Sequence, residues 1–220
     1  MSTLEQNRAV ALDRLAPYLA EFPLEWIIAQ GDLVTAVVVE RRGEDQHELA
    51  IFQTFRIVEG EIVEEWSNAA VGTAPPGAGA PQPASHVPLP VGPGDASVNT
   101  RKVVDFFRLV LESHDPSAAK DHVTEGYLQH AGHIAPGRKG LEDFVRATFP
   151  DGPVPTPDEL PFPPAILMGE GDRVVIAGAL PQPDGTGGTY LRYAYDGFRF
   201  EGGLIAEHWS GIDPDNRPVH

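Results

Sequence analysis

The spacing of hydrophobic residues predicts a helix at the start of the chain. Between residues 2 and 22 apolar side chains recur every three or four positions, as on one face of an amphipathic helix. Ser2 and Glu5 stand at the spacing of a capping box. Pro17 is expected to break or kink this helix, and Pro23 to end it, because proline lacks the backbone donor that a helix interior needs.

Extended segments follow the helix. Runs rich in β-branched residues, separated by turn residues such as Gly31-Asp32, predict four strands at 24–29, 33–41, 48–58 and 61–70. We therefore expect residues 1–72 to form a helix packed on an antiparallel meander.

Residues 73–96 differ in composition from the rest of the chain. They are almost entirely Pro, Gly, Ala, Ser and Val, which is typical of a semi-extended linker. A role as a proline-rich ligand for a partner remains an alternative, although no basic residues flank the segment.

Residues 97–220 again combine helices and strands. A helix with an apolar face including Val103, Phe106 and Val110 is expected to be capped by Ser97, Asn99 or Thr100. Further elements are predicted as a short helix at 115–116 onward, a strand at 126–130, a helix at 139–149, and strands at 165–168, 173–180, 189–200 and 204–212. The expected fold is α+β, a cone formed by helices on one face of a curved antiparallel sheet.

One stretch of sequence occurs twice. Residues 55–67 and 198–210 share Phe, Arg, Gly, Ile, Glu, Trp and Ser at the same positions, and a Gly-Asp turn precedes each copy. Both copies predict a β-hairpin, and their length suggests duplication of one structural unit. The first unit would then begin at the counterpart of the third helix of the second. The alternative is two unrelated hairpins that share turn chemistry.

Charge and composition limit the classes of partner. Acidic residues outnumber basic ones 32 to 16, for a net charge of −16, with no cluster of Lys and Arg. Nucleic-acid phosphate would be repelled, so no nucleic-acid partner is expected. The chain has no Cys, which excludes thiol chemistry. It also has no long apolar run and no secretory signal, so we expect no membrane partner and a cytoplasmic location.

The segment Tyr127-Leu128-Gln129-His130-Ala131-Gly132-His133, continued to Gly140, resembles the Tyr-Ile-Gln-His-Asn-Pro-His signature of SnoaL-like proteins in the nuclear transport factor 2-like superfamily. The resemblance covers about residues 97–213, and residues 1–72 resemble only the C-terminal half of the family. It implies a conical pocket for a small hydrophobic or polyketide-like molecule. Family members include polyketide cyclases, isomerases, dehydratases and non-catalytic binding or dimerisation domains.

The resemblance also suggests candidate catalytic residues. In the cyclases a carboxylate directly after the last Trp is the general acid/base, but Ser210 stands there, as does Ser67 in the first copy. A neutral serine cannot take a proton from a carbon acid near pH 7. Strand alternation puts His208 on the face of Ser210, so we expect His208 to transfer the proton, with Ser210 and His130 positioning the substrate. The alternative is a structural His208 in a domain that has lost catalysis.

Other residues are expected to line the pocket or to pack in the core. Substrate-binding candidates are His133, Tyr127, Phe106 and Trp209, although buried aromatic residues often only pack. His130 and His133 also have a metal-like spacing, but zinc would need a third ligand, for which only His208 is available. We therefore expect no metal and no cofactor.

Many proteins of the resembled superfamily dimerise by packing their sheets face to face. Residues 24–70 are expected to supply such a second sheet within the same chain, or the protein to form a homodimer.

Overall fold

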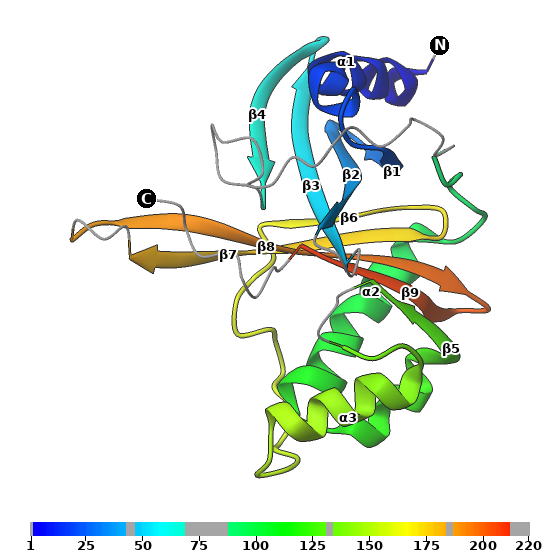
Figure 1. The fold of residues 1–220 in the computed structure, drawn as a ribbon, viewed down its shortest axis with the longest axis vertical. Coiled ribbons are helices and arrows are strands. Elements are labelled where there is room, and N and C mark those ends of the chain that lie inside the picture. Colours follow the sequence, from blue (N-terminus) through cyan, green and yellow to red (C-terminus); the bar gives the residue numbers. More distant parts are fainter. Residues whose placement is uncertain (1, 43–46, 69–87, 131–133, 184–186, 212–220) are drawn as a thin grey trace. The chain divides into compact units, whose positions relative to one another are not determined.

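The computed structural model describes residues 2–42, 47–68, 88–130, 134–183 and 187–211 (Figure 1). The chain forms two compact units. The first contains Met1–Val91, Ala179–Tyr195 and Ser210–His220; the second contains Gly92–Gly178 and Asp196–Trp209.

The first helix of the first unit, α1 (Thr3–Leu19), begins at the predicted cap. Ser2 accepts a hydrogen bond from the backbone N–H of Glu5, and the Glu5 carboxylate accepts from that of Ser2. Pro17 lies inside the helix and does not break it, contrary to the expectation. It occupies the last turn, where its missing donor removes one hydrogen bond and only two residues follow.

The four predicted strands of the first unit are confirmed, with small shifts at their ends. They are β1 (Leu24–Gln30), β2 (Leu33–Arg42), β3 (His47–Val58) and β4 (Glu61–Ser67). They form one antiparallel sheet in sequence order. Ala11 and Leu15 of α1 pack against Val34 and Phe55 of this sheet. The apolar stripe of the helix therefore covers one sheet face.

The first unit also includes the C-terminal half of β7 and the N-terminal half of β8. Tyr195, which is fully buried, stacks on Phe52 with 5.1 Å between the ring centroids. Its hydroxyl donates to Oγ1 of Thr54 at 3.1 Å. Thr54 and Thr35 share a further buried hydrogen bond of 2.8 Å. The buried hydroxyl groups are thus satisfied by one another.

Helices and a second sheet make up the rest of the chain. In order they are α2 (Ala96–Phe106), the π-helical turn η1 (Phe107–Glu112), the 3-10 helix η2 (Pro116–Asp121), β5 (Val123–Gln129), α3 (Arg138–Thr148), β6 (Ile166–Glu170), β7 (Arg173–Pro183), β8 (Thr189–Glu201) and β9 (Leu204–Ser210). The strand order is β5-β9-β8-β7-β6. Because β5 runs parallel to β9, the sheet is mixed. The predicted α+β class is confirmed, and none of the described helices is long and apolar enough to cross a membrane.

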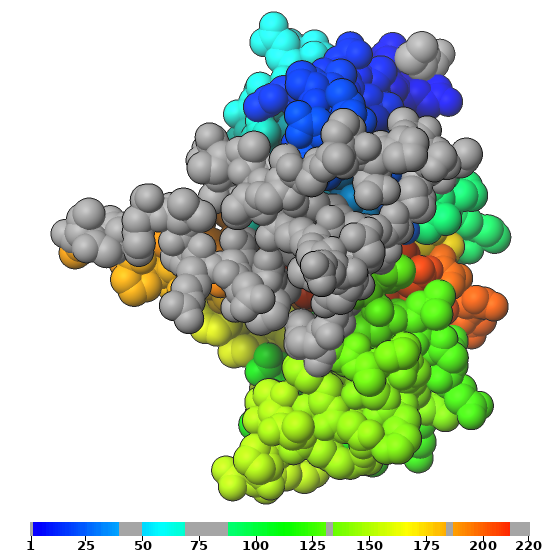
Figure 2. All heavy atoms as spheres, in the orientation of Figure 1, coloured from blue at the N-terminus to red at the C-terminus, as the bar shows by residue number. Residues whose placement is uncertain are grey.

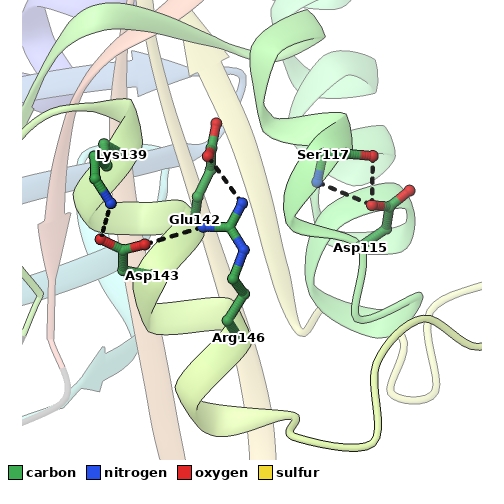
Figure 3. Close-up of polar contacts among 6 residues, drawn as sticks. All are labelled: Asp115, Ser117, Lys139, Glu142, Asp143 and Arg146. Carbon is green, nitrogen blue, oxygen red and sulfur yellow. Dashed lines mark hydrogen bonds and ion pairs between the residues drawn. The ribbon is translucent and has the colours of Figure 1, made fainter.

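The helix caps follow local chemistry. Asp95 caps α2, and the three predicted residues do not. Its carboxylate accepts hydrogen bonds from the backbone N–H groups of Ser97 and Val98. Asp115 caps η2 as expected, with Pro116 in the first turn. Figure 3 shows its contacts with Ser117.

The outer face of α3 carries ion pairs between residues one turn apart. Asp143 binds Lys139 and Arg146, and Arg146 also binds Glu142 (Figure 3). The opposite face buries Leu141 and Val145 in the core of the second unit. This core also contains Phe106, Tyr127, Phe198 and Phe200, so aromatic rings fill much of the space between the helices and the sheet.

Equivalent contacts occur at the same places in the two units. Asn7 of α1 donates to the carbonyl of Gly31, and Asn99 of α2 donates to that of Gly171. In the hairpins, Arg56 pairs with Glu64 at 2.5 Å as Arg199 pairs with Glu207 at 2.7 Å. By the asparagine contacts α1 resembles α2, whereas the sequence led us to expect the third helix as its counterpart. Asn7 and Asn99 lie near the starts of the two helices. The sequences around them share too few residues for the match to be recognised without the structure.

Candidate functional site

Three aromatic rings form a row across neighbouring strands of the second unit. Phe198 of β8 lies parallel to His208 of β9, with 4.8 Å between the ring centroids. Tyr127 of β5 lies on the other side of His208, at 6.4 Å. Phe198 also contacts Phe106 of α2 at 6.0 Å. The imidazole of His208 therefore lies on the helix-covered face of the sheet.

A carboxylate fixes the orientation of this imidazole. Nε2 of His208 lies 2.8 Å from Oδ1 of Asp196 on β8. Since a carboxylate only accepts hydrogen bonds, Nε2 is the donor and the neutral ring keeps a lone pair on Nδ1. That Nδ1 is buried and has no hydrogen-bond partner among the described residues. An aspartate that holds one imidazole nitrogen leaves the other nitrogen as an oriented base.

The register of the hairpin explains why His208 faces the helices. In the first hairpin, Phe55 pairs with Glu65 and Arg56 with Glu64, and the register shifts directly after Arg56. The second hairpin has the same offset, since Phe198 contacts His208 and Arg199 contacts Glu207. These contacts place His208 with Phe198 on one face of the second hairpin, and Glu207 with Arg199 on the other.

The opposite face of β9 carries a charged network. Glu207 accepts from Arg199 at 2.7 Å and contacts Nε2 of His130 at 2.8 Å. Burial by itself would raise the pKa of Glu207, but the hydrogen bonds to His130 and Arg199 outweigh it and hold the pKa below its ordinary value. The ring of His130 also stacks on Trp209, with 4.9 Å between the centroids.

The predicted catalytic residues are therefore not gathered at one point. His208 contacts Asp196 and the aromatic row, whereas His130 contacts Glu207 and Trp209 through the other side of the strand. Ser210 is buried at the end of β9. Strand alternation accounts for the separation, because successive side chains point to opposite faces.

The predicted binding residues have different surroundings. Tyr127 and Phe106 are buried in the core of the second unit, and Gln129 donates to the Tyr127 hydroxyl at 3.3 Å. Burial raises the pKa of Tyr127 well above its usual value. Trp209 is fully buried and lies under the guanidinium of Arg173 at 5.3 Å. His133 lies outside the described residues.

Sequence reasoning missed Asp196. The available signal was its position two residues before Phe198, which alternation assigns to the same face of β8. Its partner could not be found without the register between β8 and β9. Within the part of the chain that the structure describes, no group of three or more His, Asp or Glu is arranged to hold a metal ion.

Helices over one face of a mixed sheet place the second unit in the nuclear transport factor 2-like class of α+β folds. Residues 103–208 match the family model described as a SnoaL-like domain, and this part of the chain is a SnoaL-like domain. No curated protein matches the chain.

Solved structures resemble about half of the chain. A candidate polyketide cyclase from Acidithiobacillus ferrooxidans is 17% identical, with 51% of this chain and 86% of that chain covered and a TM-score of 0.37. A candidate SnoaL-like polyketide cyclase from Jannaschia sp. CCS1 is 18% identical, covering 57% and 90%, with a TM-score of 0.34. A de novo designed protein with a curved β-sheet is 15% identical, covering 53% and 87%, with a TM-score of 0.37.

Proposed function

We infer that the SnoaL-like domain binds a small, largely apolar carbonyl compound and moves a proton at the carbon next to the carbonyl, without a cofactor. The reaction class includes aldol-type cyclisation, isomerisation and dehydration. His208 is the acid/base group and Asp196 positions it. The observation that carries this proposal is the buried, unpartnered Nδ1 of an imidazole whose Nε2 is held by a carboxylate.

The surroundings of His208 suit this chemistry. The parallel rings of Phe198 and Tyr127 restrict the imidazole to one plane, so Nδ1 keeps one direction. A base that is already oriented loses little entropy when the substrate binds. The nearby aromatic groups offer an apolar surface for a hydrophobic substrate. When Nδ1 takes the proton, Asp196 stabilises the imidazolium that forms.

A second candidate function is binding without catalysis. It is favoured by the packing of the protein's own rings, since Phe106 contacts Phe107 at 5.7 Å and Phe198 at 6.0 Å. It is also favoured by Ser210, which stands where the resembled cyclases have a carboxylate. In this case the domain is a ligand-binding or dimerisation module, and His208 is a structural residue.

Exchange of carbon-bound hydrogen tests the proposal before the substrate is known. The full chain is incubated in D₂O with cyclic ketones and β-keto esters, and loss of the α-proton signal is followed by ¹H NMR. We expect saturable acceleration by the wild type. His208→Gln should lower it by about 10²-fold or more, the usual contribution of a general base. Asp196→Asn should also lower it, because the amide can donate to Nε2 and hold the tautomer whose Nδ1 already carries a proton.

His114→Asn is the matched control, because His114 belongs to the same unit but stacks on Phe149. It should leave the exchange rate unchanged. Saturable binding of the same compounds with no exchange would favour the non-catalytic module. Exchange that persists in His208→Gln would remove His208 from the mechanism.

A further inference from the structure

The first unit has an open groove whose lining residues are far from His208 along the chain. It has a volume of about 500 Å³ and lies between the start of α1 and two turns of the sheet. Its lining includes Thr3, Asn7, Asp32, Val58 and Gly60. Helix α1 forms part of the surface drawn in Figure 2, in blue.

In the second unit, the corresponding turn is covered by the chain itself. The backbone N–H of Gly92 donates to Oδ1 of Asp172 at 2.7 Å, and the carbonyl of Gly92 accepts from the N–H of Asp172 at 3.2 Å. Asn99 binds the carbonyl of the residue before Asp172, and Asn7 binds the carbonyl of the residue before Asp32, so the two aspartates hold corresponding positions. The segment before α2 thus covers Asp172 in the second unit. The corresponding place beside Asp32 in the first unit is the open groove.

Close approach makes glycine necessary in this covering segment. A Cβ atom on Gly92 would lie 2.6 Å from Oδ2 of Asp172. One on Gly94 would lie 2.5 Å from the carbonyl oxygen of Gly171. The atom that faces Gly94 is backbone and cannot move aside, and the one that faces Gly92 belongs to the carboxylate that accepts the Gly92 hydrogen bond, so a Gly-x-Gly spacing is part of the fit.

The two aspartates differ in exposure as this comparison predicts. The side chain of Asp172 is 12% exposed, whereas that of Asp32 is 45% exposed. The backbone around them is otherwise equivalent, because the Asp32 carbonyl accepts from Ile57 at 2.7 Å and the Asp172 carbonyl accepts from Phe200 at 2.8 Å. The covering segment is one difference between the two positions, and the arginine partner is another, since Asp32 binds Arg56 whereas Asp172 lies 3.7 Å from Arg173.

We propose that the groove beside Asp32 binds an extended peptide containing Gly-x-Gly. The first glycine donates its N–H to the Asp32 carboxylate and accepts from the Asp32 backbone, while the second lies against the Gly31 carbonyl. One oxygen of this carboxylate, Oδ2, binds Arg56, which fixes the acceptor in place. Backbone recognition of this kind gives affinity, and the requirement for glycine gives specificity.

The test uses the full chain and a synthetic peptide with the sequence of residues 90–94, acetyl-Pro-Val-Gly-Pro-Gly-amide. Binding is followed by ¹⁵N NMR. We expect saturable shifts of the Asn7 side-chain amide and of the Asp32 and Gly60 backbone amides. The peptide with alanine in place of both glycines should bind at least tenfold more weakly.

Two protein variants locate the contact. Asp32→Ala should weaken the glycine peptide at least fivefold, because it removes the acceptor. Glu64→Ala is the matched control, since Glu64 also binds Arg56 but does not line the groove. Val58→Trp, which fills the groove from an exposed position, provides a second blocking variant.

Four results would overturn the proposal, three of them with the wild-type chain. These three are the absence of saturable shifts, equal binding of the two peptides, and shifts at Gly171 and Asp172 in place of Asn7 and Asp32. Unchanged binding by Val58→Trp would equally count against it.

Discussion

His208 and Asp196 are joined by a hydrogen bond of 2.8 Å between neighbouring strands of one sheet. The bond fixes which imidazole nitrogen carries the proton, and it leaves Nδ1 buried with no hydrogen-bond partner among the described residues. A serine at position 210 therefore does not deprive this domain of a candidate base.

Replacing Asp196 should change both the tautomer of His208 and the stability of the fold. In the wild type we expect ¹⁵N NMR of the ring to show the Nε2–H tautomer. Asp196→Ala should give a mixture of tautomers and lower the free energy of unfolding by about 1–3 kcal/mol, because a buried donor loses its partner. Asp196→Asn can donate to Nε2 as well as accept from it, so it should also lose the tautomer preference, but it should cost less stability because the buried nitrogen keeps a partner. A wild-type ring with its proton on Nδ1 would contradict the assignment.

Glu207 should contribute more to stability than its neighbour Glu201, although both bind Arg199. Glu207→Gln should lower the unfolding free energy by about 2 kcal/mol in urea titrations, since it weakens hydrogen bonds between buried charged groups. The Glu201 side chain is 73% exposed, so Glu201→Gln should cost less than about 0.5 kcal/mol. Equal losses in the two variants would show that burial does not matter here.

The pH dependence of stability should reflect the lowered pKa of Glu207. A carboxyl group with a lower pKa in the folded state stabilises it fully above the unfolded pKa, near 4.5, and this contribution is lost as the pH falls through the folded pKa. The stability difference between wild type and Glu207→Gln should therefore shrink when urea titrations are repeated below about pH 4.5. A difference that stays constant to pH 2 would contradict the assignment.

Deleting residues 1–72 should expose an apolar surface. Tyr195 would lose its stack on Phe52 and its hydrogen bond to Thr54. We expect sedimentation velocity to show a dimer or larger species, as anticipated if the first sheet replaces an intermolecular one. Tyr195→Ser in the same fragment should reduce association, because it removes the large exposed ring. A fragment that stays monomeric with an unchanged melting temperature would contradict this role.

Local patterns were sufficient for most of the fold. The capping box at Ser2 and Glu5 and the strands of the first unit could be predicted, because each depends on neighbouring residues. The residues predicted to cap α2 lie inside the helix. The actual cap is Asp95, which is also a strong capping residue. The π-helical turn η1 has no comparable sequence signal.

The candidate site was predictable only in part. Alternation along β9 correctly separates Glu207, which contacts Arg199 and His130, from His208, which contacts Phe198. It also assigns His208 and Ser210 to one face. Alternation cannot predict whether the side chain of His130 contacts Glu207 or the surroundings of His208, because the answer depends on how β5 lies beside β9. In the structure it contacts Glu207.

The sequence by itself determined most of the elements, the SnoaL-like domain and His208 as the residue to test, because periodicity and motif are properties of adjacent positions. Only the tertiary structure decided that Asp196 holds the imidazole and that Asp32 borders an open groove while Asp172 is covered. These relationships join residues distant along the chain or depend on strand register, so short-range sequence patterns do not specify them.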